Sequence, residues 1–399
     1  MKLPHAEWQR RPAMARLLDS LAAGRGETRY VGGCVRDTLR DADVSDVDLA
    51  TRFKPDEVMG RLREAKIKAV PTGLAHGTVT AVIEGKPVEI TTLRRDVSTD
   101  GRRATVAYTD DWKEDAARRD FTINALSADP QTAEVHDYFG GCEDLAAGRV
   151  RFIGAPLQRI AEDHLRILRF FRFHARFGRD APGAEALEAC ADRANDLMAL
   201  SRERIADELL KLLALPEPAA TVQLMISRGI LRPVIPEIDE AGGDRLAELV
   251  EREKVAGVEG EALRRFSALL PPSPETATSV GRRLRLSNKA LKRLANAVLP
   301  VDAPPETLAY EIGREGAVDR ILIARGDPYE ARRLDGWQRP RLYVGGGSLI
   351  EMGLQPGPVV ARCLHDVQRR WATAGFPADK ETQMGIARAA VERLLGDSR

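Results

Sequence analysis

The sequence predicts an α+β protein in which a small N-terminal head with a mixed sheet is followed by an elongated, all-helical body. Two observations lead to this prediction. Short strand-like runs, separated by turns and a helix, occupy the first third of the 399-residue chain. From about residue 156 onward the strand signal disappears, while helical periodicity continues with interruptions at Pro and Gly. The length also favours two or more domains.

The elements of the head are expected in a simple order. An amphipathic helix is predicted first, and a second helix separates two of the later strands. A highly charged, weakly patterned segment over 94–119 is expected to be a mobile loop. The predicted helices cover 6–24 and 55–65, and the strand-like runs cover 30–31, 44–50, 78–83 and 88–93.

Composition restricts the function only weakly. The chain has 61 Lys+Arg against 60 Asp+Glu, so its net charge of +1 gives no indication of a nucleic-acid partner. No apolar run is long enough to span a bilayer, and the first eleven residues lack a hydrophobic stretch, so we expect no membrane segment, no secretory signal and a cytoplasmic location. The cysteines are too far apart to suggest a disulfide framework or a zinc site; they are Cys34, Cys142, Cys190 and Cys363.

The first candidate site is a glycine turn that follows a predicted strand. Tyr30-Val31 leads into Gly32-Gly33, and a helix is expected to begin after them. Glycines let the backbone approach a polyphosphate closely, and the N–H groups of a helix N-terminus can donate to it. Arg36 would add a charged donor. Gly-Gly turns are common, and taken alone this one fits an ordinary turn better.

A pair of carboxylates follows the turn. Asp46 and Asp48 stand two residues apart on a predicted strand, so they share one face, while Val47 and Leu49 point into the core. Because adjacent carboxylates repel, a cation between them is a natural explanation, and Mg²⁺ prefers such oxygen ligands. Two metals ~4 Å apart can activate an attacking hydroxyl and stabilise the leaving group. Such a pair is usually an exposed strand edge, but after this turn it favours a metal site.

A third carboxylate, Glu89, lies on another predicted strand. Its neighbours Val88 and Ile90 face the other way, so Glu89 would be able to join the two aspartates as a catalytic residue. An exposed strand acid would show the same pattern, and the two interpretations are equally well supported.

Five ordered motifs resemble those of the class II nucleotidyltransferases of the polymerase-β superfamily, the tRNA nucleotidyltransferase/poly(A) polymerase family. The first combines Gly32-Gly33-Cys34-Val35-Arg36-Asp37 with Asp46-Val47-Asp48. The others lie at 118–125, 137–145, 162–173 and 201–205, so that the resemblance covers about residues 29–215. It implies a polymerase-β-like catalytic head over 1–150, a neck of nucleotide-recognition helices over 151–215, a helical body over 216–340 and a tRNA-binding tail over 341–399.

The resemblance also implies the chemistry and the roles of individual residues. The protein would use CTP and ATP with two Mg²⁺ ions, and Asp46 and Asp48 would hold the metals. One of Arg118 and Arg119 would contact the nucleotide. The full set of implied nucleotide-binding residues is Gly32, Gly33, Arg36, Arg118, Arg119, Asp120, Asn124, Asp163, Arg166, Arg169 and Arg172.

Within this set, Asp163 and Arg166 would read the incoming base. They are three residues apart on a predicted helix, so their side chains are expected to be neighbours. An ionised Asp only accepts hydrogen bonds and Arg only donates them, which suits the donor and acceptor pattern shared by cytosine and adenine and leaves unpaired groups with guanine and uracil. An ordinary salt bridge between i and i+3 is the alternative.

Other segments favour CCA addition to tRNA over poly(A) synthesis. The segment Thr72-Gly73-Leu74-Ala75-His76-Gly77-Thr78-Val79 resembles one found in CCA-adding enzymes, as does the tail from Gly345 through Pro356-Gly357-Pro358 to Trp371. A simple helix hairpin turn is the alternative explanation of the tail. The charged segment at 94–112 matches the position of the family's flexible loop, which helps the switch from CTP to ATP, and a solvated linker would show the same composition. The alternatives are a poly(A) polymerase, a partial enzyme that adds only C or only A, a nucleotidyltransferase acting on a small molecule, and a catalytically inactive RNA-binding protein.

Overall fold

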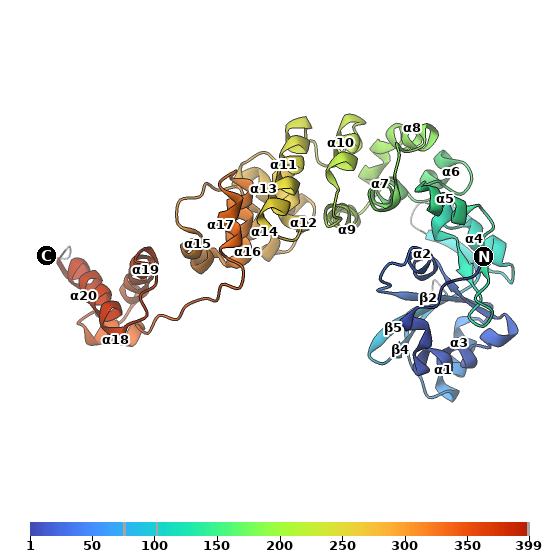
Figure 1. Cartoon of the computed structure of the whole chain (residues 1–399), viewed down its shortest axis with the longest axis horizontal. Helices are drawn as coiled ribbons and strands as arrows, with labels where there is room; N and C mark the ends of the chain where they lie inside the picture. Colours follow the sequence, from blue (N-terminus) through green and yellow to red (C-terminus); the bar gives the residue numbers. More distant parts are fainter. Residues whose placement is uncertain (75–76, 101–102, 397–399) are drawn as a thin grey trace. The chain divides into compact units, whose positions relative to one another are not determined.

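The computed structural model describes residues 1–74, 77–100 and 103–396, and Figure 1 labels many of its elements. Ala75 and His76 of the Thr72–Val79 segment, and residues 101–102 of the charged segment, lie outside the described part. The chain forms two compact units. The first contains residues 1–201 and 228–234, and the second contains residues 202–227 and 235–399. Each is described by itself.

The first unit is built on a seven-stranded sheet with the order β3-β4-β5-β2-β1-β8-β9. β2 and β5 are parallel, whereas the other neighbouring pairs are antiparallel, so the predicted mixed sheet is confirmed. The strands are β1 (Thr28–Val31), β2 (Val47–Thr51), β3 (Lys68–Gly73), β4 (Thr78–Ile83), β5 (Lys86–Thr92), β8 (Ser127–Ala128) and β9 (Val135–His136).

Several local predictions for this unit need correction. The predicted helix over 6–24 is split into a 3₁₀ turn, η1 (Glu7–Arg10), and α1 (Pro12–Ser20), because Pro12 lacks an N–H and therefore starts a new helix. The segment expected to be a mobile loop forms a hairpin of β6 (Arg94–Asp100) and β7 (Arg103–Tyr108), followed by α4 (Trp112–Ala117). The predicted helix over 55–65 is α3 (Pro55–Glu64), in agreement with the pattern.

A cluster of aromatic rings joins the end of the sheet domain to the helices that follow it. Phe121 packs against Phe152, Phe170 and Phe173, with ring centroids 4.9, 6.2 and 5.4 Å away. Burial of such rings stabilises packing strongly. The helices involved here and nearby are α2 (Gly33–Leu39), α5 (Gly141–Ala147), α6 (Pro156–Glu162), α7 (Arg166–Phe177), α8 (Ala184–Asp192) and the 3₁₀ segments η2 (Ala23–Arg25), η4 (Thr122–Asn124) and η5 (Ala194–Ala199).

The regular elements in the described part of the second unit are all helices, joined by turns and loops, which confirms the predicted helical body. One apolar cluster joins α11, α15 and α16 around Leu249, Leu308 and Leu322, and another holds α18, α19 and α20 together around Leu349 and Val391. The helices are α9 (Arg202–Leu213), α10 (Ala219–Ser227), α11 (Glu240–Ala256), α12 (Ala262–Leu269), α13 (Pro274–Arg283), α14 (Asn288–Ala297), α15 (Pro305–Ile312), α16 (Arg314–Ile323), α17 (Pro328–Arg332), α18 (Gly346–Glu351), α19 (Pro358–Thr373) and α20 (Lys380–Gly396).

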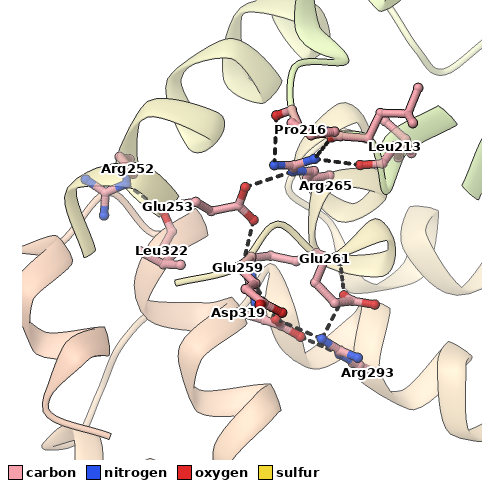
Figure 2. Close-up of polar contacts among 12 residues, drawn as sticks. Leu213, Pro216, Arg252, Glu253, Glu259, Glu261, Arg265, Arg293, Asp319 and Leu322 are labelled. Carbon is pink, nitrogen blue, oxygen red and sulfur yellow. Dashed lines mark hydrogen bonds and ion pairs between the residues drawn. The ribbon is translucent and has the colours of Figure 1, made fainter. Parts of the chain in front are cut away.

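A buried charge network fastens these body helices together (Figure 2). The carboxylate of Glu253 on α11 accepts from Arg264 at 2.6 Å and from Arg265 at 2.8 Å, both on α12. Arg264 also donates to Asp319 on α16 at 2.9 Å. Arg265 additionally donates to the carbonyl of Leu213 at the C-terminal end of α9, at 2.8 Å. The four charged side chains are all buried, so each depends on its partners.

We expect Glu253→Gln to lower the free energy of unfolding of this unit by about 3 kcal/mol, because buried Arg265 would lose its counter-charge and buried Arg264 would keep only Asp319. Urea unfolding followed by circular dichroism measures the effect. Glu251→Gln is the matched control, since Glu251 lies on the same helix but is exposed and paired only at the surface with Lys254. A loss for Glu253→Gln no larger than that of the control would show that the network does not hold the helices.

Candidate active site

The predicted glycine turn joins β1 to α2 as expected. Gly32 is the N-cap residue of α2 and has φ +68°, a conformation that favours glycine. A Cβ added to Gly32 would lie 3.0 Å from Nη1 of Arg119. The turn therefore needs glycine both for its backbone angle and for the close approach of a cationic side chain.

The carboxylates Asp46, Asp48 and Glu89 lie together at neighbouring strands. Asp46 immediately precedes β2 and is exposed, whereas Asp48 lies within β2 and is half-buried. Asp48 and Glu89 are direct partners in the parallel pairing of β2 with β5, so their side chains leave the same face of the sheet. The predicted inward orientation of Val47 and Leu49 is confirmed by their burial.

The electrostatic environment of Asp48 disfavours its ionised form. Burial, followed by the nearby charges of Glu89 and Asp46, raises the pKa of Asp48 to about 6, although Arg119 acts in the opposite direction. The same residues that disfavour a lone carboxylate would favour a bound cation. Among the described residues, no three His, Cys, Asp or Glu side chains are arranged as a complete metal cage.

Arg118 and Arg119, which the sequence did not distinguish, face different surroundings. Arg118 is held by Asp115 at 2.9 Å, and burial lowers its pKa to about 10. Arg119 reaches the glycine turn, where its Nη1 donates to the Asn124 carbonyl at 3.3 Å. Its positive charge favours the ionised form of Asp48. Arg119 is thus the arginine beside both the turn and the carboxylates.

Asp120 and Asn124 form the centre of a hydrogen-bonded chain. Nδ2 of Asn124 donates to Oδ1 of Asp120 at 2.9 Å, and Arg169 on α7 donates to Oδ2 of Asp120 at 2.7 Å. Burial alone would raise the pKa of Asp120, but the Arg169 guanidinium and these hydrogen bonds outweigh it, so the pKa lies below its usual value. Asp120 is therefore an ionised, buried anchor for Arg169.

Arg36 extends this chain on its other side. Its Nη1 donates to Oδ1 of Asn124, and its Nε and Nη2 donate to the two oxygens of Asp37, each at 2.9 Å. The guanidinium also lies 4.6 Å from the Phe177 ring centroid. Arg36 is buried and its donors are engaged within the protein, which favours support of the turn over direct contact with a nucleotide.

The predicted base-reading pair does not lie on one helix. α6 ends at Glu162, Asp163 has extended backbone angles of φ −152° and ψ 107°, and α7 begins at Arg166. The expectation that Asp163 and Arg166 are neighbours through helical spacing was therefore wrong. They are adjacent through a turn instead, in which the backbone N–H of Arg166 donates to the Asp163 carbonyl at 3.0 Å.

The side chains of this turn have defined partners within the protein. The Asp163 carboxylate accepts from the backbone N–H of Leu165 at 3.1 Å. Arg166 forms an ion pair with Glu162 and donates to the carbonyls of Arg159 at 3.0 Å and Arg118 at 3.1 Å. Since Arg118 precedes Arg119, this hydrogen bond ties the turn to the segment beside the carboxylates.

Arg172, also predicted to contact the nucleotide, lies on α7 with its guanidinium 4.4 Å from the Phe173 ring centroid. Two residues that were not predicted as site residues join the same assembly. Asp37 holds Arg36, and Arg176 donates to Asp37 at 3.2 Å. Asp37 does stand inside the first motif, and Arg176 follows Arg169 by two helical turns, so both positions carried a usable signal.

No described helix is both long enough and apolar enough to cross a membrane.

Two protein families match the chain. Residues 28–151 match the poly A polymerase head domain, and residues 183–241 match a family described as a probable RNA and SrmB-binding site of polymerase A. The first match contains the glycine turn, the carboxylates and the Asp120–Asn124 segment described above.

Whole-length relatives and solved structures agree with these matches. The mitochondrial CCA tRNA nucleotidyltransferase 1 of Mus musculus is 33% identical, over 96% of this chain and 91% of its own. The CCA-adding enzyme of Streptococcus gordonii is 29% identical, over 92% and 94%. The fold is that of the Bacillus stearothermophilus CCA-adding enzyme solved with CTP, which is 24% identical with a TM-score of 0.74 over 97% of this chain and 99% of that one. The chain therefore belongs to the tRNA nucleotidyltransferase/poly(A) polymerase family, to which its motifs were already similar.

Proposed function

We propose that this protein adds CCA to the 3′ end of tRNA without a nucleic-acid template, using CTP and ATP and releasing pyrophosphate. The observation that carries the proposal is the meeting of a glycine turn, Arg119 and the Asp46/Asp48 pair in one unit of the fold. These are the groups that a nucleoside triphosphate and its metal require. The relatives matched over nine-tenths of both chains, whose names specify CCA addition, support this substrate over others.

The acidic group fits a divalent cation, and we propose Mg²⁺. Asp46 and Asp48 would hold it, because their oxygens are its preferred ligands and because Asp48 is partly buried beside the carboxylates of Glu89 and Asp46. Mg²⁺ is usually bound by one or two carboxylates together with substrate phosphates. Such ions supply Lewis-acid activation of the attacking hydroxyl and the leaving group. Glu89 lies beside Asp48, and its negative charge would add to the attraction of the site for a cation.

The chain's own residues would position the reactants for in-line attack. The RNA 3′-hydroxyl attacks the α-phosphorus, a P–O bond forms, and the bond to pyrophosphate breaks. The turn at Gly32-Gly33 would admit the triphosphate, and Arg119 would offset its charge. Arg169, fixed by Asp120, and Arg172 would complete the phosphate and sugar contacts from α7. Holding the groups in this geometry supplies much of the rate.

The turn at 163–166 would select the base. Asp163 as acceptor and Arg166 as donor match the pattern that cytosine and adenine share. In this structure the Arg166 guanidinium is paired with the Glu162 carboxylate. The incoming base would therefore replace Glu162 as the partner of Arg166. Reading both nucleotides with one pair of side chains explains how addition can proceed without a template.

Contacts from scattered arginines and lysines to the RNA phosphates would dominate affinity for tRNA, so binding would weaken as salt rises. A cytoplasmic location remains part of the proposal, as the site of tRNA processing.

An extension assay tests the proposal. A tRNA transcript that ends before CCA is incubated with Mg²⁺ and with CTP plus ATP, and the products are sized and sequenced. Products three nucleotides longer, ending in CCA, are expected. Long A tails would favour a poly(A) polymerase, and arrest after CC would indicate a partial enzyme. Extension of neither tRNA nor other RNA would favour an RNA-binding protein without activity.

A further inference from the structure

A closed chain of polar contacts connects α2 to two points on α7. It runs from Arg169 to Asp120, Asn124, Arg36 and Asp37 and returns to α7 at Arg176. The members come from segments far apart in sequence, and Asp37 and Arg176 are separated by 139 positions. Groups that are hydrogen-bonded in series orient one another, and the effect is stronger where water is excluded.

The two anchor points on α7 have a geometric consequence. Arg169 and Arg176 are seven residues apart, which places them on nearly the same face of the helix and about 10 Å apart along its axis. A single contact would let α7 pivot about that point. Two contacts fix both the direction of the helix axis and the rotation of α7 about this axis. Phe173 and Phe177 lie on this face, and the Arg36 guanidinium contacts both rings, at 5.3 and 4.6 Å from their centroids.

We infer that Asp37 and Arg176 are positioning residues that set the placement of α7, and with it Arg166 and Arg169, against the glycine turn. The inference rests on the proposed function and deepens it, because it assigns nucleotide affinity and base selection partly to a contact that is not expected to touch the nucleotide. Arg166 is the first residue of α7, one turn before Arg169. A change in the roll of α7 would displace both arginines from the phosphates and the base.

The test measures the Kd of CTP and of UTP by calorimetry in the presence of Mg²⁺, together with kcat and KM for CTP on tRNA. We expect Arg176→Gln to raise the Kd and KM for CTP about three- to tenfold, to narrow the preference for CTP over UTP, and to change kcat less than twofold. Compared with Arg176→Gln, Arg176→Lys should recover most of the CTP affinity, since lysine keeps the positive charge although it lacks the paired N–H donors of the guanidinium.

The matched control is Arg61→Gln. Arg61 forms one ion pair, with Glu57, and its side chain is 31% exposed against 38% for Arg176. This control should leave Kd and selectivity unchanged, and thermal unfolding should show that each variant is folded.

A double-mutant cycle with Asp37→Asn separates positioning from direct contact. If the two residues act as a unit, adding Arg176→Gln to Asp37→Asn should cause little further loss of CTP affinity. A full, additive loss would mean that Arg176 touches the nucleotide itself, and an unchanged Kd in Arg176→Gln would also overturn the inference. Wild-type protein that binds CTP but does not extend tRNA would instead reject the proposed function while leaving the binding test valid.

Discussion

Asp48→Asn is expected to abolish nucleotide addition, with a loss of about 10³-fold or more in kcat, because it removes a carboxylate from the proposed metal pair. Asn keeps the size and one oxygen of Asp, so the loss would not come from a cavity. The measurement is single-turnover addition of labelled CMP to tRNA at saturating CTP. Turnover within tenfold of wild type would contradict the metal role of Asp48.

The same substitution is expected to stabilise the protein in the absence of metal. Asp48 has a folded-state pKa of about 6, above the value of ~3.9 for an unfolded aspartate, so the folded state binds the proton more tightly. Stability is therefore lost as the pH rises from about 4 to about 6, through ionisation of Asp48. Asn removes that penalty, and after allowance for its partial exposure we expect a gain of roughly 1 kcal/mol at pH 8 and little gain at pH 4.

Thermal unfolding at both pH values, with and without Mg²⁺, checks this expectation. Mg²⁺ should raise the Tm of the wild type more than that of the variant, because ligand binding to the folded state stabilises it. Asp43→Asn is the control, since Asp43 is an exposed acid in the segment before β2. A variant that is less stable than wild type at pH 8 without metal would show that Asp48 is not a strained carboxylate.

Arg166→Ala is expected to relax base choice. Loss of the paired donor should reduce the ratio of kcat/KM for CTP to that for UTP by about 10- to 100-fold, since a good bidentate contact discriminates by about 1–3 kcal/mol. Steady-state kinetics with each of the four nucleotides measures the change. With Arg166 present, bound uracil leaves the guanidinium donors unpaired, which disfavours UTP. Alanine has no such donors, so misincorporation of U should rise as correct addition falls.

Arg159→Ala is a closely matched control for this prediction. Arg159 also pairs with Glu162, and its side chain is 12% exposed against 13% for Arg166. Its removal should lower stability without changing the order of base preference. Equal selectivity in wild type and Arg166→Ala would exclude Arg166 as a base reader.

The parts of the fold that followed from the sequence are those set by local pattern. The strands that contain Asp48 and Glu89 alternate apolar and polar residues, so both their existence and the shared face of the carboxylates were predictable. The glycine turn was equally visible, because its Gly32 has a backbone angle that few other residues adopt. Helical periodicity was sufficient for the body.

The parts that did not follow depend on contacts between distant residues. Nothing in Glu162-Asp163-His164-Leu165 interrupts a helical pattern, yet α6 ends there, with the Asp163 carboxylate on the Leu165 N–H and the Arg166 side chain on the Arg118 carbonyl. The charged 94–108 segment has too few apolar residues to indicate strands, and its hairpin is held by pairing between its own two arms. The first motif and the helical spacing from Arg169 mark the positions of Asp37 and Arg176, but the contact between these two residues has no local signature.

The most direct test of CCA addition is stepwise extension of three tRNA acceptors that end before the first C, after one C and after two. Each acceptor receives a single labelled nucleotide with Mg²⁺. The predicted result is C on the first two acceptors and a single A on the third, with no addition of G or U. Repeated addition of A to the first acceptor would contradict CCA addition and identify a poly(A) polymerase.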